Sequence, residues 1–177
     1  MTSTLYIIGQ ILGIAAVILG SVSMQMKSPG KILFLQIINA FIFSAHYLLI
    51  GAYTAISLNL LAGIQCIFYY FRDKRQSKSL IEPIVFTTLM IVVSILTWED
   101  WYSVFIMVGL AINSASLAFP DAQMIRISMF LKSPACLLYN IFVLSGGGII
   151  YECAVLISSV IGLKRNRSDK PVKTENA

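Results

Sequence analysis

Seven apolar runs, each of about 17–25 residues, fill most of this 177-residue chain. An α-helix rises about 1.5 Å per residue, so a run of this length crosses the roughly 30 Å hydrocarbon core of a bilayer. Short breaks with glycine, proline or charged residues separate the runs. The expected transmembrane helices are Leu5–Met24, Lys31–Ile50, Tyr53–Phe71, Ile81–Thr97, Trp101–Ala118, Ile125–Ser145 and Gly148–Leu163. The sequence therefore predicts an all-α membrane protein.

The composition excludes a soluble domain. Hydrophobic residues make up 58% of the chain, charged residues 12%, and the mean hydropathy is +0.83, against about 45–50% and about 25% in soluble proteins. Residues 1–4 carry no lysine or arginine, so we expect the first run to be a retained helix and no cleaved signal peptide. Cys66, Cys136 and Cys153 lie in apolar runs without CxxC spacing, so no metal site, cofactor or disulfide framework is expected.

The distribution of basic residues predicts the orientation. With seven alternating helices, twelve of the 13 lysines and arginines fall on one side, and the thirteenth, Lys132, lies within the sixth run. The positive-inside rule then places the amino terminus outside and the carboxyl terminus in the cytoplasm. The net charge of +5 thus reflects membrane topology, and no nucleic-acid partner is expected.

An internal repeat organises the seven runs. Shifted by 93 residues, Ser23–Arg72 lies over Ser116–Arg165 without a gap, and the layout of helices, turns and basic stops recurs. Residues 5–71 and 101–163 would be two parallel three-helix repeats. Residues 72–100 would supply a cytoplasmic linker, an inverting fourth helix and an outer loop. Gly146-Gly147-Gly148 would separate the last two helices, and the polar tail 164–177 is expected to be disordered.

Short motifs resemble those of one bacterial family. They are Ser23-Met24-Gln25-Met26-Lys27, His46-Tyr47-Leu48-Leu49-Ile50-Gly51, Lys132-Ser133-Pro134, Tyr139-Asn140, Glu152 and Ser158-Ser159-Val160-Ile161-Gly162. The chain resembles the bacterial inner-membrane YgjV-type family and, in its three-plus-one-plus-three layout, the SWEET sugar transporters and the wider PQ-loop group. The resemblance implies a SWEET-like fold in the bacterial inner membrane. The proline–glutamine pair of the PQ-loop group is absent, and Pro134, a candidate hinge, aligns with Phe41.

Polar residues within the apolar runs are the candidate site residues, because a central Asp, Lys or Arg costs roughly 2.5–3.5 kcal/mol on insertion. An outer layer holds His46 and Glu152, with Tyr139 and Asn59 as their repeat partners. One interpretation is a proton relay or a solute-binding pair in a central cavity. The other places His46 and Glu152 near the outer headgroups, hydrogen-bonded to water.

An inner layer holds Asn39 and its repeat partner Lys132, with Gln36 and Asn113 at similar depth. The stem of Lys132 could extend to the cytoplasmic surface. Alternatively, its ammonium faces a cavity, held by Asn113 or Asn39, where it would attract an anionic group.

Tyr47 and Asn140 also align across the repeat. Asn140 could bind a polar solute such as a sugar hydroxyl, or form a bond between helices. Gly9, Gly13 and Gly20 predict close packing of the first helix, within the bundle or in a homodimer. Glu82, Glu99 and Asp100 are expected to be solvated at the membrane edges.

Two functional hypotheses remain open. The first is a small-solute carrier, working by uniport or linked to protons, with one site between two halves. The second is a membrane assembly or stress-related protein without a solute site. Neither HExxH, GxSxG nor a phosphate-binding loop occurs, and the chain has a single histidine, so no catalytic residue or enzyme activity is expected. The expected partners are the lipid bilayer and a small polar solute.

Overall fold

A computed structural model describes residues 3–75, 81–117 and 121–165, which form seven α-helices and no strand. The helices are α1 (Ser3–Gln25), α2 (Pro29–Ile50), α3 (Tyr53–Arg75), α4 (Ile81–Leu96), α5 (Ser103–Ser116), α6 (Ala122–Phe142) and α7 (Gly146–Arg165). Each coincides with one of the seven apolar runs, so the all-α prediction is confirmed. Lys164 and Arg165, expected to begin a disordered tail, are instead the last residues of α7, and the rest of the expected tail, residues 166–177, lies outside the described part of the chain.

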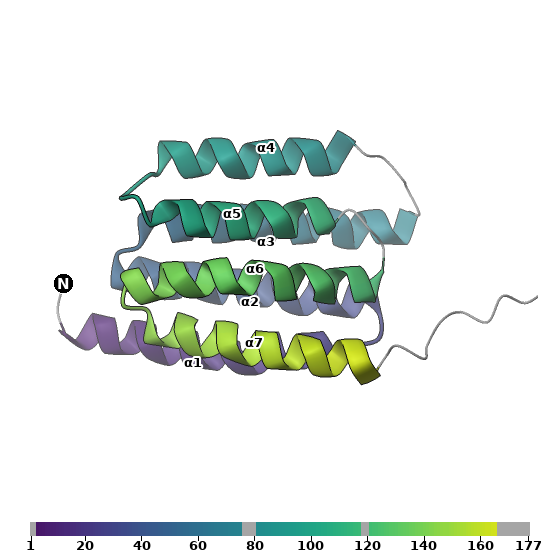
Figure 1. Ribbon diagram of the computed structural model, residues 1–177, viewed down its shortest axis with the longest axis horizontal. Helices are drawn as coiled ribbons and strands as arrows, with labels where there is room; N and C mark the ends of the chain where they lie inside the picture. Colours follow the sequence, from purple (N-terminus) through teal and green to yellow (C-terminus); the bar gives the residue numbers. More distant parts are fainter. Residues whose placement is uncertain (1–2, 76–80, 118–120, 166–177) are drawn as a thin grey trace, which may run out of the picture.

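The seven helices run side by side in two layers (Figure 1). Helices α1, α2 and α3 form one layer, and α7, α6 and α5 cover it in that order. Helix α1 packs against α2 and α7, α6 packs against α5 and α7, and α2 touches α6 at the centre. Helix α4 lies at one edge, mainly against α5. The centre of the bundle is therefore built from both triplets of helices.

In the part of the chain that the structure describes, four helical segments are long and apolar enough to cross a bilayer: Thr4–Gln25, Pro29–Ile50, Tyr53–Arg72 and Gly146–Arg165. Helices α4 and α5 are apolar but shorter, with 16 and 14 residues. At about 1.5 Å per residue they extend roughly 24 and 21 Å, less than the roughly 30 Å hydrocarbon core. Large apolar side chains such as Ile18 and Ile84 are mostly exposed on the outside of the bundle. That outer surface suits contact with lipid.

Several helix boundaries differ from the prediction, and the turns before α5 and α7 show the cause. Helix α5 begins at Ser103, after Trp101, since the Ser103 amide donates to the Asp100 carbonyl and residues 98–102 form a turn. The expected glycine break is wrong: Gly146, Gly147 and Gly148 form the first turn of α7. The turn between α6 and α7 is Val143–Ser145, where Leu144 has a φ of 53°.

The turn between α2 and α3 requires a glycine. Gly51 caps α2 with a φ of 83°, in the left-handed region, and its amide donates to the carbonyl of Tyr47 at 2.9 Å. At the other end, Pro29 opens α2, where its missing N–H removes no helical hydrogen bond. Helix α2 therefore has fixed ends and presents its middle, from Gln36 to Tyr47, to the centre of the bundle.

Candidate functional site

A small cavity of about 40 Å³ lies inside the bundle, between α2, α3, α5, α6 and α7. Its walls combine apolar and polar side chains: Gln36, Asn39, Ala40, Phe43, Tyr47, Asn59, Ala62, Cys66, Ile106, Leu110, Asn113, Met129, Lys132, Cys136, Tyr151 and Glu152. Six of the nine candidate binding residues are in this lining, while His46, Tyr139 and Asn140 are not. Residues of both polar layers expected from the sequence thus line one cavity: Asn59 and Glu152 of the outer layer, and Gln36, Asn39, Asn113 and Lys132 of the inner layer.

Two residues of opposite charge line the cavity on neighbouring helices. Lys132 lies halfway along α6 and is 7% exposed, and Glu152 lies two turns into α7 and is 4% exposed. The Lys132 ammonium is 5.9 Å from the centre of the Tyr151 ring, so Lys132 does not extend to the surface. Within the described residues, Arg72 and Glu82 form an ion pair but Lys132 and Glu152 do not. Two charges buried this deeply in a membrane protein are costly unless they bind something.

Several polar atoms at the cavity lack a hydrogen-bond partner. Asn39 donates to the Tyr151 hydroxyl at 2.8 Å, but its own carbonyl oxygen, Oδ1, has no donor. The Glu152 oxygen Oε2 is likewise unpaired. Asn113 accepts from Ser128 at 3.1 Å, which orients its NH2 group as a remaining donor. Buried polar groups are normally satisfied, so unpaired acceptors at a cavity point to a bound polar species.

Tyr47 and Asn140 join the two layers of helices at the centre of the bundle. The Tyr47 hydroxyl of α2 donates to Asn140 Oδ1 of α6 at 2.7 Å, and both side chains are buried. Gly148 packs directly on this amide, because a Cβ there would lie 2.3 Å from Asn140 Oδ1. Asn140 therefore forms a bond between helices. Pro134, the candidate hinge, lies in the same helix between Lys132 and Asn140.

His46 is fully buried but bonds away from the cavity. Its Nδ1 lies 2.6 Å from the carbonyl of Gly9, and its Nε2 lies 2.7 Å from the hydroxyl of Ser145. A carbonyl only accepts, so Nδ1 carries a proton, and the Ser145 hydroxyl can donate to a neutral Nε2. His46 thus connects α1 and α2 to the turn before α7, and neither of its ring nitrogens bonds Glu152.

At the end of the bundle that holds the α2–α3 turn, side chains cap helix amino termini and join neighbouring helices. Glu99, in the turn before α5, accepts from the backbone amides of Tyr53 and Thr54 at 2.7 and 3.3 Å. Tyr139 donates to the same carboxylate at 3.3 Å. A carboxylate is favoured at the positive end of a helix. Glu99 is exposed, as expected, but it also connects α3 with α6.

A second cap lies on the opposite side of the bundle. Gln10 of α1 accepts from the amide of Gly147 at 2.8 Å and donates to the carbonyl of Leu144 at 3.2 Å. The backbones approach closely here, because a Cβ on Gly147 would lie 2.7 Å from the Cα of Gly13. The glycines of α1 thus pack inside the bundle: Gly9 faces α2, and Gly20 faces Tyr151.

The carboxyl-terminal end of α1 is held by a buried arginine. Arg126 of α6 is 1% exposed, and its Nε donates to the carbonyl of Met24 at 2.8 Å. A second nitrogen donates to the carbonyl of Met26, and a third to the side chain of Gln123 at 3.2 Å. Carbonyls at a helix carboxyl terminus lack helical partners, so a guanidinium satisfies them well. Arg126 therefore ties α1 to α6.

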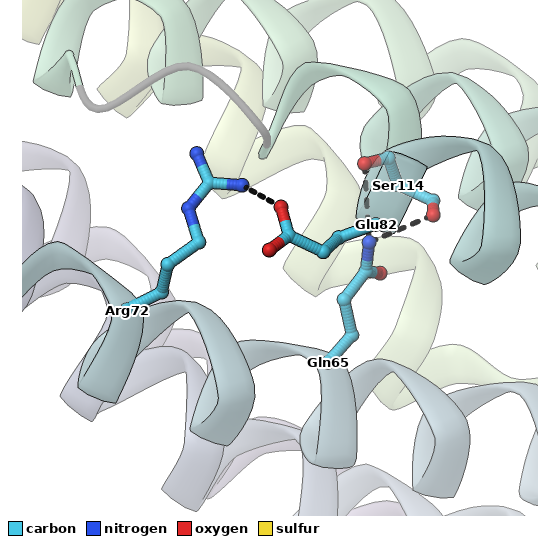
Figure 2. Close-up of polar contacts among 4 residues, drawn as sticks. All are labelled: Gln65, Arg72, Glu82 and Ser114. Carbon is cyan, nitrogen blue, oxygen red and sulfur yellow. Dashed lines mark hydrogen bonds and ion pairs between the residues drawn. The ribbon is translucent and has the colours of Figure 1, made fainter. Parts of the chain in front are cut away.

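Polar contacts also join α3 to its neighbours, as Figure 2 shows. Gln65 donates to the hydroxyl and the carbonyl of Ser114 in α5, at 2.8 and 3.1 Å. About two turns further along α3, Arg72 forms an ion pair with Glu82 of α4 at 2.7 Å. Both contacts are well suited to hold helices together.

The sequence did not single out Arg126, Gln65 or Gln10, and it treated Glu99 as solvated. In the sequence, a buried arginine in the first turns of a helix looks the same as an arginine whose side chain extends to the membrane surface. One signal existed for Gln65: the 93-residue shift places it over Ser158, which donates to the carbonyl of Ser21 at 2.8 Å. Within the described residues, no group of three His, Cys, Asp or Glu side chains could hold a metal ion.

Comparison with known proteins supports one family. The family Imp-YgjV, described as bacterial inner membrane protein, matches residues 7–170. No curated protein matches the chain, and no solved structure does.

Proposed function

The chain belongs to the Imp-YgjV family of bacterial inner membrane proteins, and from this premise we propose that it is a small-solute carrier with one central site. The cavity carries the proposal. It lies between helices of both triplets, midway along α6, and it holds two buried charges and two unpaired acceptor atoms. Carriers with internal repeats bind their solutes at such a place, near the bilayer midplane and at the junction of the repeats.

Hydrogen bonds related by the 93-residue shift support a parallel repeat. The Gln65–Ser114 contact of α3 and α5 corresponds to the Ser158–Ser21 contact of α7 and α1. The central Tyr47–Asn140 bond joins two positions that are themselves 93 residues apart. A two-fold axis between α2 and α6 accounts for both observations, since it would exchange α1 with α5 and α3 with α7.

The outer caps follow the same relation. Gln10 bonds the amide of Gly147, and the shifted positions, Ser103 and Thr54, approach to 3.4 Å between their hydroxyls. The proposed arrangement is therefore three helices, an inverting α4 and three helices, as in SWEET-like carriers. The distribution of basic residues favours an outer amino terminus and a cytoplasmic carboxyl terminus.

The alternative is a membrane protein that transports nothing. One observation favours it: the cavity is small, and clasps such as Glu99–Tyr139 and Arg126–Met24 close the bundle at both ends. In that case the buried polar groups only hold helices together, as interhelical hydrogen bonds do in membrane proteins. A carrier, in contrast, must open the cavity to water on each side in turn.

Two native cysteines provide the test. Cys66 and Cys136 line the cavity and are each 4% exposed, whereas Cys153 lies on the outside of α7. In the Cys153→Ser variant, reconstituted in vesicles, a membrane-impermeant methanethiosulfonate should label the cavity cysteines through transient opening. The matched background is the Cys66→Ser/Cys136→Ser variant, which keeps only Cys153. Labelling from both faces of the membrane supports a carrier. Protection of both cavity cysteines from both faces would refute it and leave the non-transporting alternative.

A further inference from the structure

We propose that the cavity binds a small zwitterion, a molecule with one ammonium and one carboxylate group, of which the smallest α-amino acids are the natural examples. The inference rests on the proposed function and specifies the class of solute. Its basis is the pair Lys132 and Glu152, both more than nine-tenths buried and both in the cavity wall without an ion pair between them. The two charges offset each other only at a distance, and a zwitterion would give each of them a direct counter-charge while the site stays neutral.

The hydrogen-bond pattern of the wall matches the two ends of such a solute. Glu152 Oε2 and Asn39 Oδ1 are acceptors without donors, and a solute ammonium has three N–H groups to offer them. Lys132 offers three donors, and Asn113 offers the NH2 group that its bond from Ser128 leaves free. These donors suit a carboxylate. The acceptors of the cavity wall thus suit the ammonium of such a solute, and the donors suit its carboxylate.

The cavity volume limits the solute to a few heavy atoms. A water molecule needs roughly 10–15 Å³ of such space, so about 40 Å³ accommodates about three water-sized groups. Glycine, with about five heavy atoms, is the zwitterion nearest to this limit, whereas a hexose would need a much larger cavity, as drug-sized ligands do at about 300–1,000 Å³. A lone cation or anion would fit in volume, but it would leave Lys132 or Glu152 without a partner.

Competition with cysteine labelling tests the proposal on the full-length protein. The Cys153→Ser variant in vesicles is treated with the methanethiosulfonate in the presence of glycine, alanine, methylamine, acetate or glycerol. At about ten times its Kd, a bound solute should slow labelling of Cys66 and Cys136 about tenfold, because only the free protein reacts. Glycine and alanine should protect, and the three other compounds should not at equal concentration.

Charge-deleting variants separate a binding role from a structural one. Lys132→Met should weaken glycine protection about tenfold to a hundredfold and make methylamine a better ligand than acetate. Glu152→Gln should reverse that preference. The neutral Lys132→Met/Glu152→Gln variant removes both buried charges, retains a folded protein and should bind none of the charged compounds. Lys164→Met, at the exposed end of α7, is the matched control and should protect like the parent.

The outcomes distinguish the two proposals. Opening of the cavity with protection by glycerol, acetate or methylamine alone overturns the zwitterion and keeps the carrier. Opening without protection by any of the five compounds overturns it too, and identifies a cavity filled by water only. Absence of labelling, combined with no change in thermal stability in any of the compounds, overturns both.

Discussion

Arg126→Lys is the sharpest test of how the carboxyl-terminal end of α1 is held. Arg126 donates through Nε to Met24, through another nitrogen to Met26, and through a third to Gln123. A lysine keeps the charge but lacks the planar fork that reaches two carbonyls at once. At least one charge-assisted hydrogen bond is lost, and a buried carbonyl of α1 is left unpaired. Such a bond contributes about 1.5–3 kcal/mol.

Thermal unfolding in detergent measures this loss. For a protein of this size, 1 kcal/mol corresponds to about 2–4 °C, so the melting temperature should fall by about 3–12 °C. The matched control is Arg165→Lys, the same change at the exposed end of α7, where an effect within about 0.5 kcal/mol is expected. Amide hydrogen exchange at residues 24–28 should also quicken in Arg126→Lys alone. Equal melting temperatures in the two variants would show that the guanidinium does not hold α1.

Two further predictions concern contacts between helices. Gly147→Ala places a Cβ 2.7 Å from the Cα of Gly13 and should cost about 1–3 kcal/mol in thermal unfolding by overpacking; Gly146→Ala meets only the end of the Gln10 side chain at 3.3 Å and should cost clearly less. Equal effects would contradict the close approach of α1 and α7. A double-mutant cycle of Tyr47→Phe and Asn140→Leu should give a coupling of about 0.6–1.7 kcal/mol, and additive effects would count against that bond.

The existence of all seven helices could be predicted because each rests on local information. A run of apolar residues must be helical in lipid, where every backbone group needs a partner within the chain. The ends were less predictable because distant side chains decide them. Gly147 reads as a loop residue, yet its amide bonds Gln10, more than 130 residues away. That contact depends on α1 and α7 being neighbours, which no local pattern reveals.

The candidate site was partly predictable for a different reason. The cost of a polar group in hydrocarbon marked Lys132, Glu152 and Asn39 regardless of the fold, and all three line the cavity. The same argument could not assign partners. His46 lies at the predicted depth but bonds Gly9 and Ser145, because its direction depends on the rotation of α2 against α1.

The proposed repeat makes the candidate site asymmetric, with its charges in one half of the protein. Under the 93-residue shift, Lys132 corresponds to Asn39 and Glu152 to Asn59, so both charges lie in the second half and amides take their places in the first. All four side chains line the cavity. A symmetric pair of halves would offer a zwitterion two equivalent orientations and would bury four charges instead of two. With charges in one half only, the proposed solute would have a single orientation, with its ammonium at Glu152 and its carboxylate at Lys132. In the first half, Asn39 then supplies a neutral acceptor for the solute ammonium, so that half could move relative to the bound solute without separating opposite charges.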